Sequence, residues 1–259
     1  MDIFTTYNIG SFQDEITYLV GSSPESIAVA DFNNDNRLDI VVSHGTSNEV
    51  SVLLAHDNEV FVKQASLTIS HNSKPRSFIT ADFDNDDHLD LVVAYSGTNT
   101  IAIFLGHGNI SFSTPTIYTT GSSSSLYAVA VADFNGDRYA DIVVANYGSN
   151  NIGVFLGYGN GSFGNYTTYP TDSNSYSLAV GDFDNDFISD IIVVYYNTNK
   201  IGLLYGCRDG IFSEVILIQL EYGSGPFSVV MADYNNDRKL DFVVANNGAD
   251  NLQVFLQTC

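Results

Sequence analysis

Short apolar runs alternate with polar turns along the whole chain. Apolar runs such as residues 26–30, 38–42 and 152–156 are followed by more polar stretches such as residues 162–169. The second run of each unit is dense in β-branched residues, which favour strands. No stretch has the spacing of an amphipathic helix, and turn residues recur every 8 to 12 positions. The pattern predicts an all-β fold built from units of four short strands.

The unit occurs five times at a nearly constant period. Polar nine-residue loops begin at Asp residues that are 51, 51, 49 and 51 positions apart. A period near 50 with four strands per unit is typical of a β-propeller blade. The repeats are centred on loops at residues 31–39, 82–90, 133–141, 182–190 and 233–241.

The two ends of the chain complement each other. Residues 1–20 match the end of a third strand and all of a fourth, whereas the C-terminus stops at a third strand, residues 252–256. We therefore predict a single propeller domain over residues 1–259 with five four-stranded blades, closed when the N-terminal strand joins the last blade. Closure leaves no long exposed sheet edge. An excised piece of a larger propeller or array is the alternative.

The loops carry oxygen-bearing side chains at positions 1, 3, 5 and 9. A hard cation takes six to eight oxygen ligands. Four side chains, the backbone carbonyl of position 7 and a water supply that number, so we predict one Ca²⁺ per loop. The side-chain ligands are Asp31, Asn33, Asp35 and Asp39; Asp82, Asp84, Asp86 and Asp90; Asp133, Asn135, Asp137 and Asp141; Asp182, Asp184, Asp186 and Asp190; and Asp233, Asn235, Asp237 and Asp241. The carbonyls belong to Arg37, His88, Tyr139, Ile188 and Lys239.

Other cations fit the loops less well. Positions 1, 3, 5 and 9 hold no His or Cys, which disfavours zinc and copper, and magnesium prefers to keep several waters. The loop is not an EF-hand, because position 12 is Val instead of Glu. Asp and Asn also favour plain turns, but five copies with one alternation favour a cation site. The second loop, with four Asp, is predicted to be the strongest site and the fourth the weakest case.

The charge of the chain supports this hypothesis. There are 30 acidic and 9 basic residues, a net charge of −21. So acidic a chain disfavours nucleic acid and anionic membrane as partners, and no apolar run is long enough for a membrane span. Seventeen of the acidic residues lie at the four proposed ligand positions of the loops. Without a cation, carboxylates packed so closely would repel each other.

These motifs resemble the FG-GAP/VCBS repeat family, known from integrin α-subunit propellers and from secreted proteins. The matching segments are the ADFNNDNRLDIVV-like core, the run ANYGSNNIGVFLGYGNGSF and the run GSSPESIAVADF before Asp31. The resemblance implies propeller blades, calcium in the loop between the first two strands of a blade, and an extracellular setting. The main departure lies at position 6, where such loops usually have Gly; here it is Asn36, Asp87, Arg138, Phe187 and Arg238. Integrin propellers have seven blades, so their ligand surfaces are not transferred to this chain.

Three classes of function remain open. The first is a calcium-binding extracellular recognition, adhesion or scaffold module with a protein or glycan partner. The second is a lectin, although Trp is absent, and the third is a polysaccharide lyase or hydrolase. The five His share no common repeat position and suggest no catalytic arrangement, so we expect no enzyme. Candidate contact loops follow the second strands, at residues 43–46, 95–97, 146–148, 195–197 and 246–248.

Smaller signals concern packing and covalent chemistry. Aromatic residues recur at loop position 2 and at the start of each fourth strand, and we expect them to pack between blades. Asn109, Asn160 and Asn165 fit glycosylation acceptors. Whether Cys207 and Cys259 pair is open. So is whether the chain is a mature protein or a segment of a longer secreted one.

Overall fold

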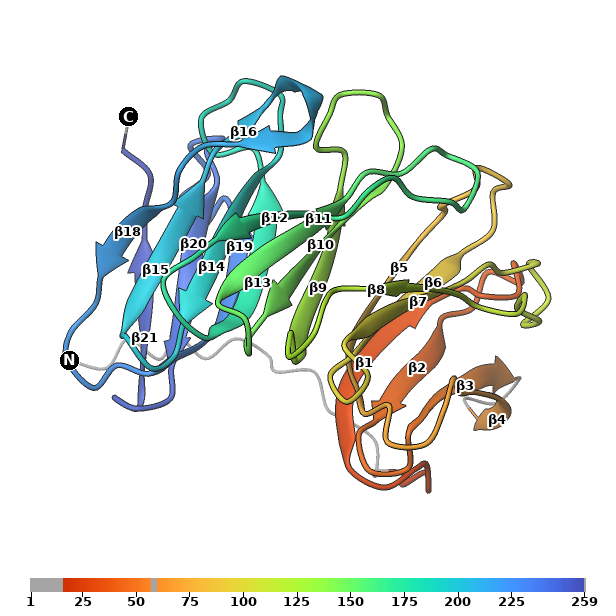
Figure 1. The fold of residues 1–259 in the computed structure, drawn as a ribbon. Helices are drawn as coiled ribbons and strands as arrows, with labels where there is room; N and C mark the ends of the chain where they lie inside the picture. The colour runs from red at the N-terminus through yellow and green to blue at the C-terminus, as the bar shows by residue number, and fades with distance from the viewer. Residues whose placement is uncertain (1–15, 57–59, 259) are drawn as a thin grey trace.

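The computed structural model describes residues 16–56 and 60–258 and confirms the all-β prediction. Five antiparallel sheets follow one another along the chain, and they fan out side by side (Figure 1). Sheet 1 contains β1 (Pro24–Ala30), β2 (Asp39–His44), β3 (Glu49–His56) and β4 (Val60–Leu67); sheet 2 contains β5 (Pro75–Ala81), β6 (Asp90–Tyr95), β7 (Thr100–Phe104) and β8 (Thr116–Thr119). Sheet 3 contains β9 (Leu126–Ala132), β10 (Asp141–Asn146), β11 (Asn151–Phe155) and β12 (Thr167–Pro170). Sheet 4 contains β13 (Ser175–Gly181), β14 (Asp190–Tyr195), β15 (Lys200–Leu204) and β18 (Ile216–Gln219); sheet 5 contains β19 (Pro226–Ala232), β20 (Asp241–Asn246) and β21 (Asn251–Phe255).

The small additional elements lie between β15 and β18 along the chain and form a separate two-stranded sheet. β16 (Gly206–Cys207) and β17 (Ile211–Phe212) form a short hairpin around a 3₁₀ turn, η1 (Arg208–Gly210). This hairpin was not predicted from the strand pattern of the sequence. Within the described residues no helix is long and apolar enough to cross a bilayer.

In sheets 1 to 4 the second and third strands form the buried centre. Every residue of β6 and β10 is buried, whereas most residues of the first strands β1 and β5 are exposed or partly exposed. The first strands β1, β5, β9, β13 and β19 contact one another in succession, so they line the inner side of the arrangement (Figure 1).

Four hydrophobic cores join consecutive sheets. β6 illustrates how: Val92 packs toward sheet 3, while its neighbour Val93 packs toward sheet 1, because successive side chains in a strand point to opposite faces. Four of the five aromatic residues at loop position 2 are buried in these cores as predicted, whereas Tyr234 of the fifth loop is exposed. Phe83 meets Phe163 with ring centroids 5.6 Å apart, and equivalent pairs are Phe32–Phe112 and Phe134–Phe212.

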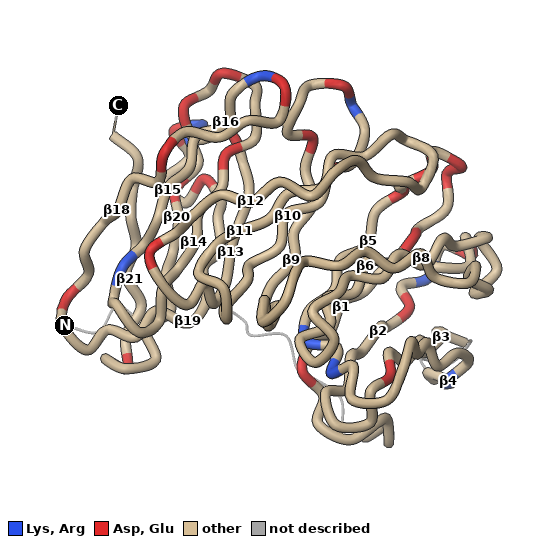
Figure 2. The backbone as a smooth tube through the Cα atoms, in the orientation of Figure 1, with Lys and Arg blue, Asp and Glu red and all other residues tan. Residues whose placement is uncertain are grey.

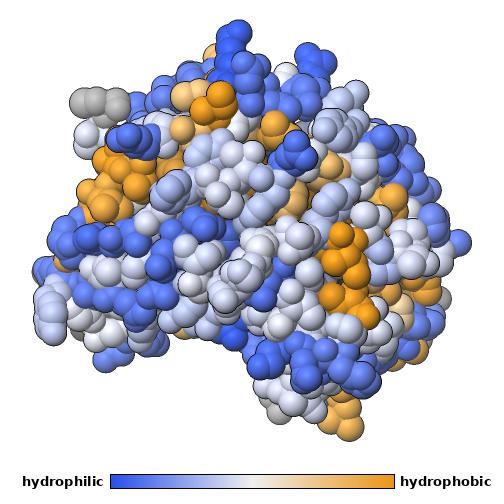
Figure 3. Space-filling view, in the orientation of Figure 1, coloured by the Kyte–Doolittle hydropathy of each residue, from blue (hydrophilic) through white to orange (hydrophobic). Residues whose placement is uncertain are grey.

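Sheet 5 is the exception, because it has three strands among the described residues. β21 pairs with β20 alone in this part of the chain, and Leu252 and Val254 are exposed. Figure 3 shows hydrophobic surface over this end of the molecule. The predicted closing strand involves residues 1–15, which lie outside the described residues, and residues 16–20, which form no strand here. Ring closure and the number of blades therefore stay predictions.

Tyr18 makes a contact that recurs elsewhere between sheets. Its ring lies 5.7 Å from that of Phe61, and its hydroxyl accepts a hydrogen bond from the Phe61 N–H at 3.2 Å. Tyr118, in the fourth strand of sheet 2, makes the same two contacts with Phe163, which lies between β11 and β12, at 5.8 and 3.1 Å. Tyr18 thus occupies, relative to sheet 1, the place of a fourth strand in a preceding sheet.

Candidate metal centres

The five Asp-rich loops share one backbone conformation. Each joins the first and second strands of its sheet, and the acidic positions gather in these loops (Figure 2). Position 6 has a positive φ in all five, including 71° at Arg138 and 69° at Phe187. The conformation that usually calls for Gly is therefore present with other residues in its place. Position 4 is also left-handed throughout, at Asn34, Asn85, Gly136, Asn185 and Asn236.

The Asp at position 1 curls each loop around itself. In the second loop, Asp82 accepts hydrogen bonds from the backbone N–H groups of Asp86, at 3.2 Å, and Asp87, at 2.9 Å. The bond to position 6 recurs in all five loops, with N–O distances between 2.7 and 2.9 Å. The loop is thus wound so that several side-chain oxygens face one region.

The Asp at position 9 ties the loop to the sheet. Asp141 is buried, and its two carboxylate oxygens accept hydrogen bonds from the N–H of Phe134, at 2.8 Å, and of Gly157, at 2.7 Å. All five loops repeat this clamp to loop position 2 and to the residue sixteen positions later. Burial raises the pKa of Asp90, Asp141 and Asp190 to about 6, against the opposite effect of these N–H bonds. Sequence reasoning assigned position 9 to the metal alone and missed the clamp.

The second and fourth loops bring carboxylates closest together. One oxygen from each of Asp82, Asp84 and Asp86 lies within 4.8 Å of the others, and so does one from each of Asp182, Asp184 and Asp190. The fourth loop, the weakest case on sequence grounds, therefore gathers its acids as well as the second does.

The carboxyl group of Asp84 is destabilised in its charged form by the neighbouring carboxylates. Burial, followed by the negative charges of Asp86 and Asp82, raises the pKa of the Asp84 carboxyl. Its Oδ1 atom is buried and has no hydrogen-bond partner among the described residues. Asp184 has a raised pKa for the same leading reasons, burial and the charge of Asp186. An unpartnered carboxylate oxygen among like charges is an environment that a divalent cation would stabilise.

The other three loops satisfy their oxygens internally. Where position 3 is Asn, its amide donates to the Asp at position 5, as Asn135 does to Asp137 at 2.9 Å. The first and fifth loops contain the same bond, from Asn33 to Asp35 and from Asn235 to Asp237. The guanidinium of Arg37 also binds Asp35 at 2.7 Å, and this hydrogen bond lowers the Asp35 pKa. We therefore expect weaker cation binding in these loops.

Phe187 is the residue least suited to its position. It holds a φ of 69° while its side chain is 95 % exposed. A left-handed conformation costs about 1–2 kcal/mol for a residue with a Cβ. Phe187→Gly is expected to raise the free energy of unfolding by about 1 kcal/mol, since the greater entropy of unfolded Gly offsets part of the relief. Urea denaturation measures the change.

Phe187→Ala is the matched control, because it removes the exposed ring and keeps the Cβ. Its stability should stay close to that of the parent protein. Equal gains from Ala and Gly would show that the ring, and not the backbone conformation, carries the cost.

The other residues that the sequence analysis singled out do not form a second catalytic or metal site in the described residues. His44 and Ser51 are hydrogen-bonded at 3.0 Å, but both are fully buried in the sheet and cannot meet a substrate. Residues 43 and 44 were assigned to a contact loop; this was wrong, because β2 extends through His44. The first residues of the other four contact loops, at positions 95, 146, 195 and 246, likewise belong to the second strands and are buried. Asn109 and Asn160 accept hydrogen bonds from the N–H two residues later within their own turns. Cys207 is exposed, and Cys259 lies outside the described residues.

The family assignment follows from the repeated loops. A family model described as FG-GAP-like repeat matches residues 31–93, 82–144, 133–193 and 182–244. Each match runs from one Asp loop into the second strand of the next sheet. The chain belongs to the FG-GAP-like repeat family. Its relatives by sequence include cartilage acidic protein 1 of Homo sapiens and of Mus musculus, each 30% identical over 135 residues. The alignment covers 46% of this FG-GAP-like chain and 20% of the relative, so the chain spans a small part of those proteins.

Solved structures share the fold at low identity. A putative 6-phosphogluconolactonase from Bacteroides fragilis superposes with a TM-score of 0.63 at 13% identity, covering 85% of this chain and 64% of the other. BBS1N, solved in complex with ARL6DN, has a TM-score of 0.60 at 16% identity, with 96% and 72% covered. An Agrocybe aegerita lectin specific for non-reducing terminal N-acetylglucosamine has a TM-score of 0.59 at 17% identity, with 90% and 66% covered. These likenesses show the fold alone, a β-propeller-like arrangement.

Proposed function

We propose that this FG-GAP-like chain is a calcium-binding recognition or scaffold module without enzymatic activity. The observation that carries the proposal is the recurrence of one loop conformation in all five repeats, with three carboxylates converging in the second and fourth loops. Plain turn chemistry accounts for Asp and Asn in a loop, but it gives no reason to gather carboxylates against their mutual repulsion.

The residues present fit a hard cation. Positions 1, 3 and 5 offer side-chain oxygens, position 7 offers its carbonyl, and position 9 keeps lone pairs free beyond its two backbone hydrogen bonds. Oxygen-only ligands in a flexible loop favour calcium over magnesium, which requires a tighter octahedron. The ion would cancel the repulsion that raises the pKa of Asp84 and Asp184.

An extracellular location suits such a module. Extracellular calcium-binding modules have dissociation constants of about 10⁻⁴–10⁻³ M, which match loops of modest affinity. The similarity to cartilage acidic protein 1 supports the same location. The partner would be a protein or a glycan, and the fold likeness to a lectin keeps glycan binding as the second candidate. A lyase or hydrolase has less support, because the described residues present no exposed catalytic arrangement; the lactonase shares only the fold.

Native mass spectrometry of the calcium-loaded chain tests the proposal. We expect up to five ions, with the second and fourth loops filled at the lowest calcium concentration. The double variant Asp84→Asn with Asp184→Asn should lose the two tightest ions and keep the weaker ones. Asp209→Asn, an exposed carboxylate in η1 and outside the Asp loops, serves as the control. A chain that takes up no ion at millimolar calcium would contradict the proposal.

A further inference from the structure

The first strands of all five sheets begin around one hollow at the end of the molecule away from the Asp loops. The hollow has a volume of about 320 Å³. It is lined by the second residue of each first strand and by the smaller third residue behind it. The second residues are Glu25, Arg76, Tyr127, Tyr176 and Phe227, and the third residues are Ser26, Ser77, Ala128, Ser177 and Ser228.

The second residues of the first strands, which surround this hollow, differ from one repeat to the next. Apart from these positions, the five first strands are similar in sequence, yet the second residue is charged in sheets 1 and 2 and aromatic in sheets 3, 4 and 5. On the charged side, Arg76 and Glu25 form an ion pair at 3.7 Å. The Arg76 guanidinium also lies 4.1 Å from the centre of the Tyr127 ring, which in turn stacks on Tyr147 at 4.4 Å. Arg76 is thus held in place with its donors beside the hollow.

The aromatic side forms a wall. Tyr176 packs against Phe227 with ring centroids 4.5 Å apart and against Tyr196 at 5.7 Å. Phe227 is 44 % exposed, so part of its ring faces solvent. The Tyr196 hydroxyl lies 3.5 Å from Oδ1 of Asn247. Tyr147, Tyr196 and Asn247 each follow a second strand, in the loops that the sequence marked as contact candidates.

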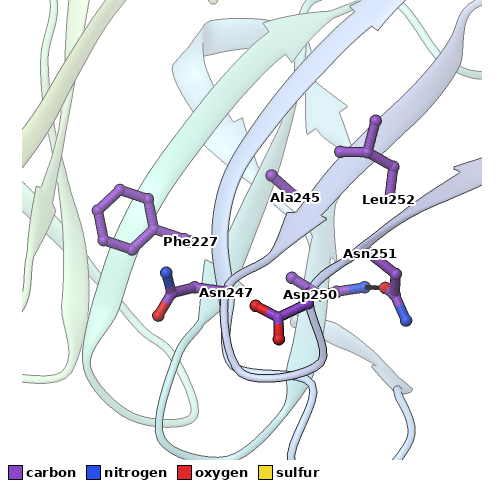
Figure 4. Close-up of a pocket in the computed structure, with 7 residues that line it drawn as sticks. Phe227, Ala245, Asn247, Asp250, Asn251 and Leu252 are labelled. Atoms are coloured by element: carbon purple, nitrogen blue, oxygen red, sulfur yellow. Dashed lines mark hydrogen bonds between the residues drawn. The ribbon is translucent and has the colours of Figure 1, made fainter.

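Phe227 also borders a second hollow, of about 540 Å³. Asn247, Asp250, Asn251 and Leu252 are among the residues that line it (Figure 4). It lies on the face of sheet 5 that would meet sheet 1 in a closed ring, because Ala245 and Leu252 correspond to Ala94 and Ile101 of sheet 2, which pack against sheet 3. Ring closure would fill this second hollow, which leaves the smaller one as the candidate ligand site.

We propose that this rim, defined as Glu25, Arg76, Tyr176, Tyr196 and Phe227, binds a neutral saccharide. The proposal rests on the proposed recognition function and names its site and ligand class. The exposed face of Phe227 would take the apolar face of a pyranose ring. Arg76 would donate to the hydroxyls of the sugar, while Glu25 and the Ser hydroxyls accept from them.

Size and charge favour this ligand over others. Small-molecule sites have volumes of about 300–1,000 Å³ and combine aromatic walls with a few polar groups, so the smaller hollow suits a mono- or disaccharide. The net charge of −21 disfavours an acidic saccharide. A protein partner would be expected to need a wider apolar surface than one exposed ring.

Saturation-transfer NMR and calorimetry with neutral hexose and N-acetylhexosamine mono- and disaccharides test the site on the full chain in calcium. Phe227→Ala should weaken binding about tenfold, the effect of losing one good aromatic contact. Arg76→Gln should weaken it as well. Phe187→Ala, which removes an exposed ring from an Asp loop, should leave it unchanged.

Two outcomes would overturn the inference: no binding of any sugar in the panel by a chain that takes up calcium, or equal binding by the parent and Phe227→Ala proteins. Binding of a protein partner through the same rim, with no sugar bound, falls under the first. Failure of the calcium proposal is distinguishable, because it removes ion uptake while Phe227-dependent sugar binding persists.

Discussion

Asp141→Asn is expected to destabilise the protein by about 4 kcal/mol, whether or not calcium is present. The Asp141 carboxylate is buried and accepts hydrogen bonds from the N–H groups of Phe134 and Gly157. A hydrogen bond to a charged group contributes about 1.5–3 kcal/mol, and an amide in its place turns its own N–H groups toward one of the two donors. The melting temperature should fall by roughly 10 °C, measured by circular dichroism in calcium and in chelator.

Asp137→Asn is the matched control in the same loop. Asp137 is exposed at position 5, and most surface substitutions change stability by no more than about 0.5 kcal/mol. In chelator this variant should therefore melt like the parent, whereas in calcium it should gain less stability. If Asp141→Asn were destabilising in calcium alone, the carboxylate would be a metal ligand and not a clamp.

A disulfide between Thr17→Cys and Gln253→Cys is expected to form within one chain. Tyr118 and Ile117 of β8 pair with Ile101 and Ala102 of β7. The equivalent register would place Tyr18 opposite Leu252 and Thr17 opposite Gln253. The contact between Tyr18 and Phe61 already holds this segment where a fourth strand of the preceding sheet would lie.

Cross-linking so distant a pair would stabilise a closed ring by up to about 5 kcal/mol, chiefly by restricting the unfolded chain. The experiment uses a background with Cys207→Ser and Cys259→Ser, and reads mass and migration on non-reducing gels. Thr17→Cys with Leu252→Cys is the control, since Leu252 points to the opposite face of β21. Cross-links between chains, or none at all, would contradict closure and favour an open arc.

The sequence repeat alone predicts most of the fold and most of the candidate metal sites. The strand pattern, the Asp loops and the packing of Phe83 against Phe163 follow from local sequence, because period, turn residues and β-branched runs all specify the same units. The left-handed backbone at position 6 was expected from the loop type, although Arg and Phe do not favour it. Its occurrence at Phe187 shows that the bonds around Asp182 override the local preference.

What the sequence did not reveal depends on contacts between distant residues. The clamp at position 9 requires an N–H sixteen residues later, and one-dimensional spacing cannot distinguish such a bond from a metal ligand. The paired Arg37 and Asp35 side chains are likewise a matter of rotamer. The rim around Phe227 does not show in the repeat pattern, because its residues differ from one repeat to the next. The signal was present at the one position of the first strand where residue type changes from charged to aromatic.

The four hydrophobic cores determine how stability is shared along the molecule. Each core joins one sheet to the next, so a sheet gains its stability from its immediate neighbours. An open arrangement of this kind unfolds inward from its two ends, beginning at the three-stranded sheet 5. Each sheet that unfolds exposes the core that it shared with the next sheet. Joining the ends removes both starting points for fraying, and unfolding then has to open two cores at once.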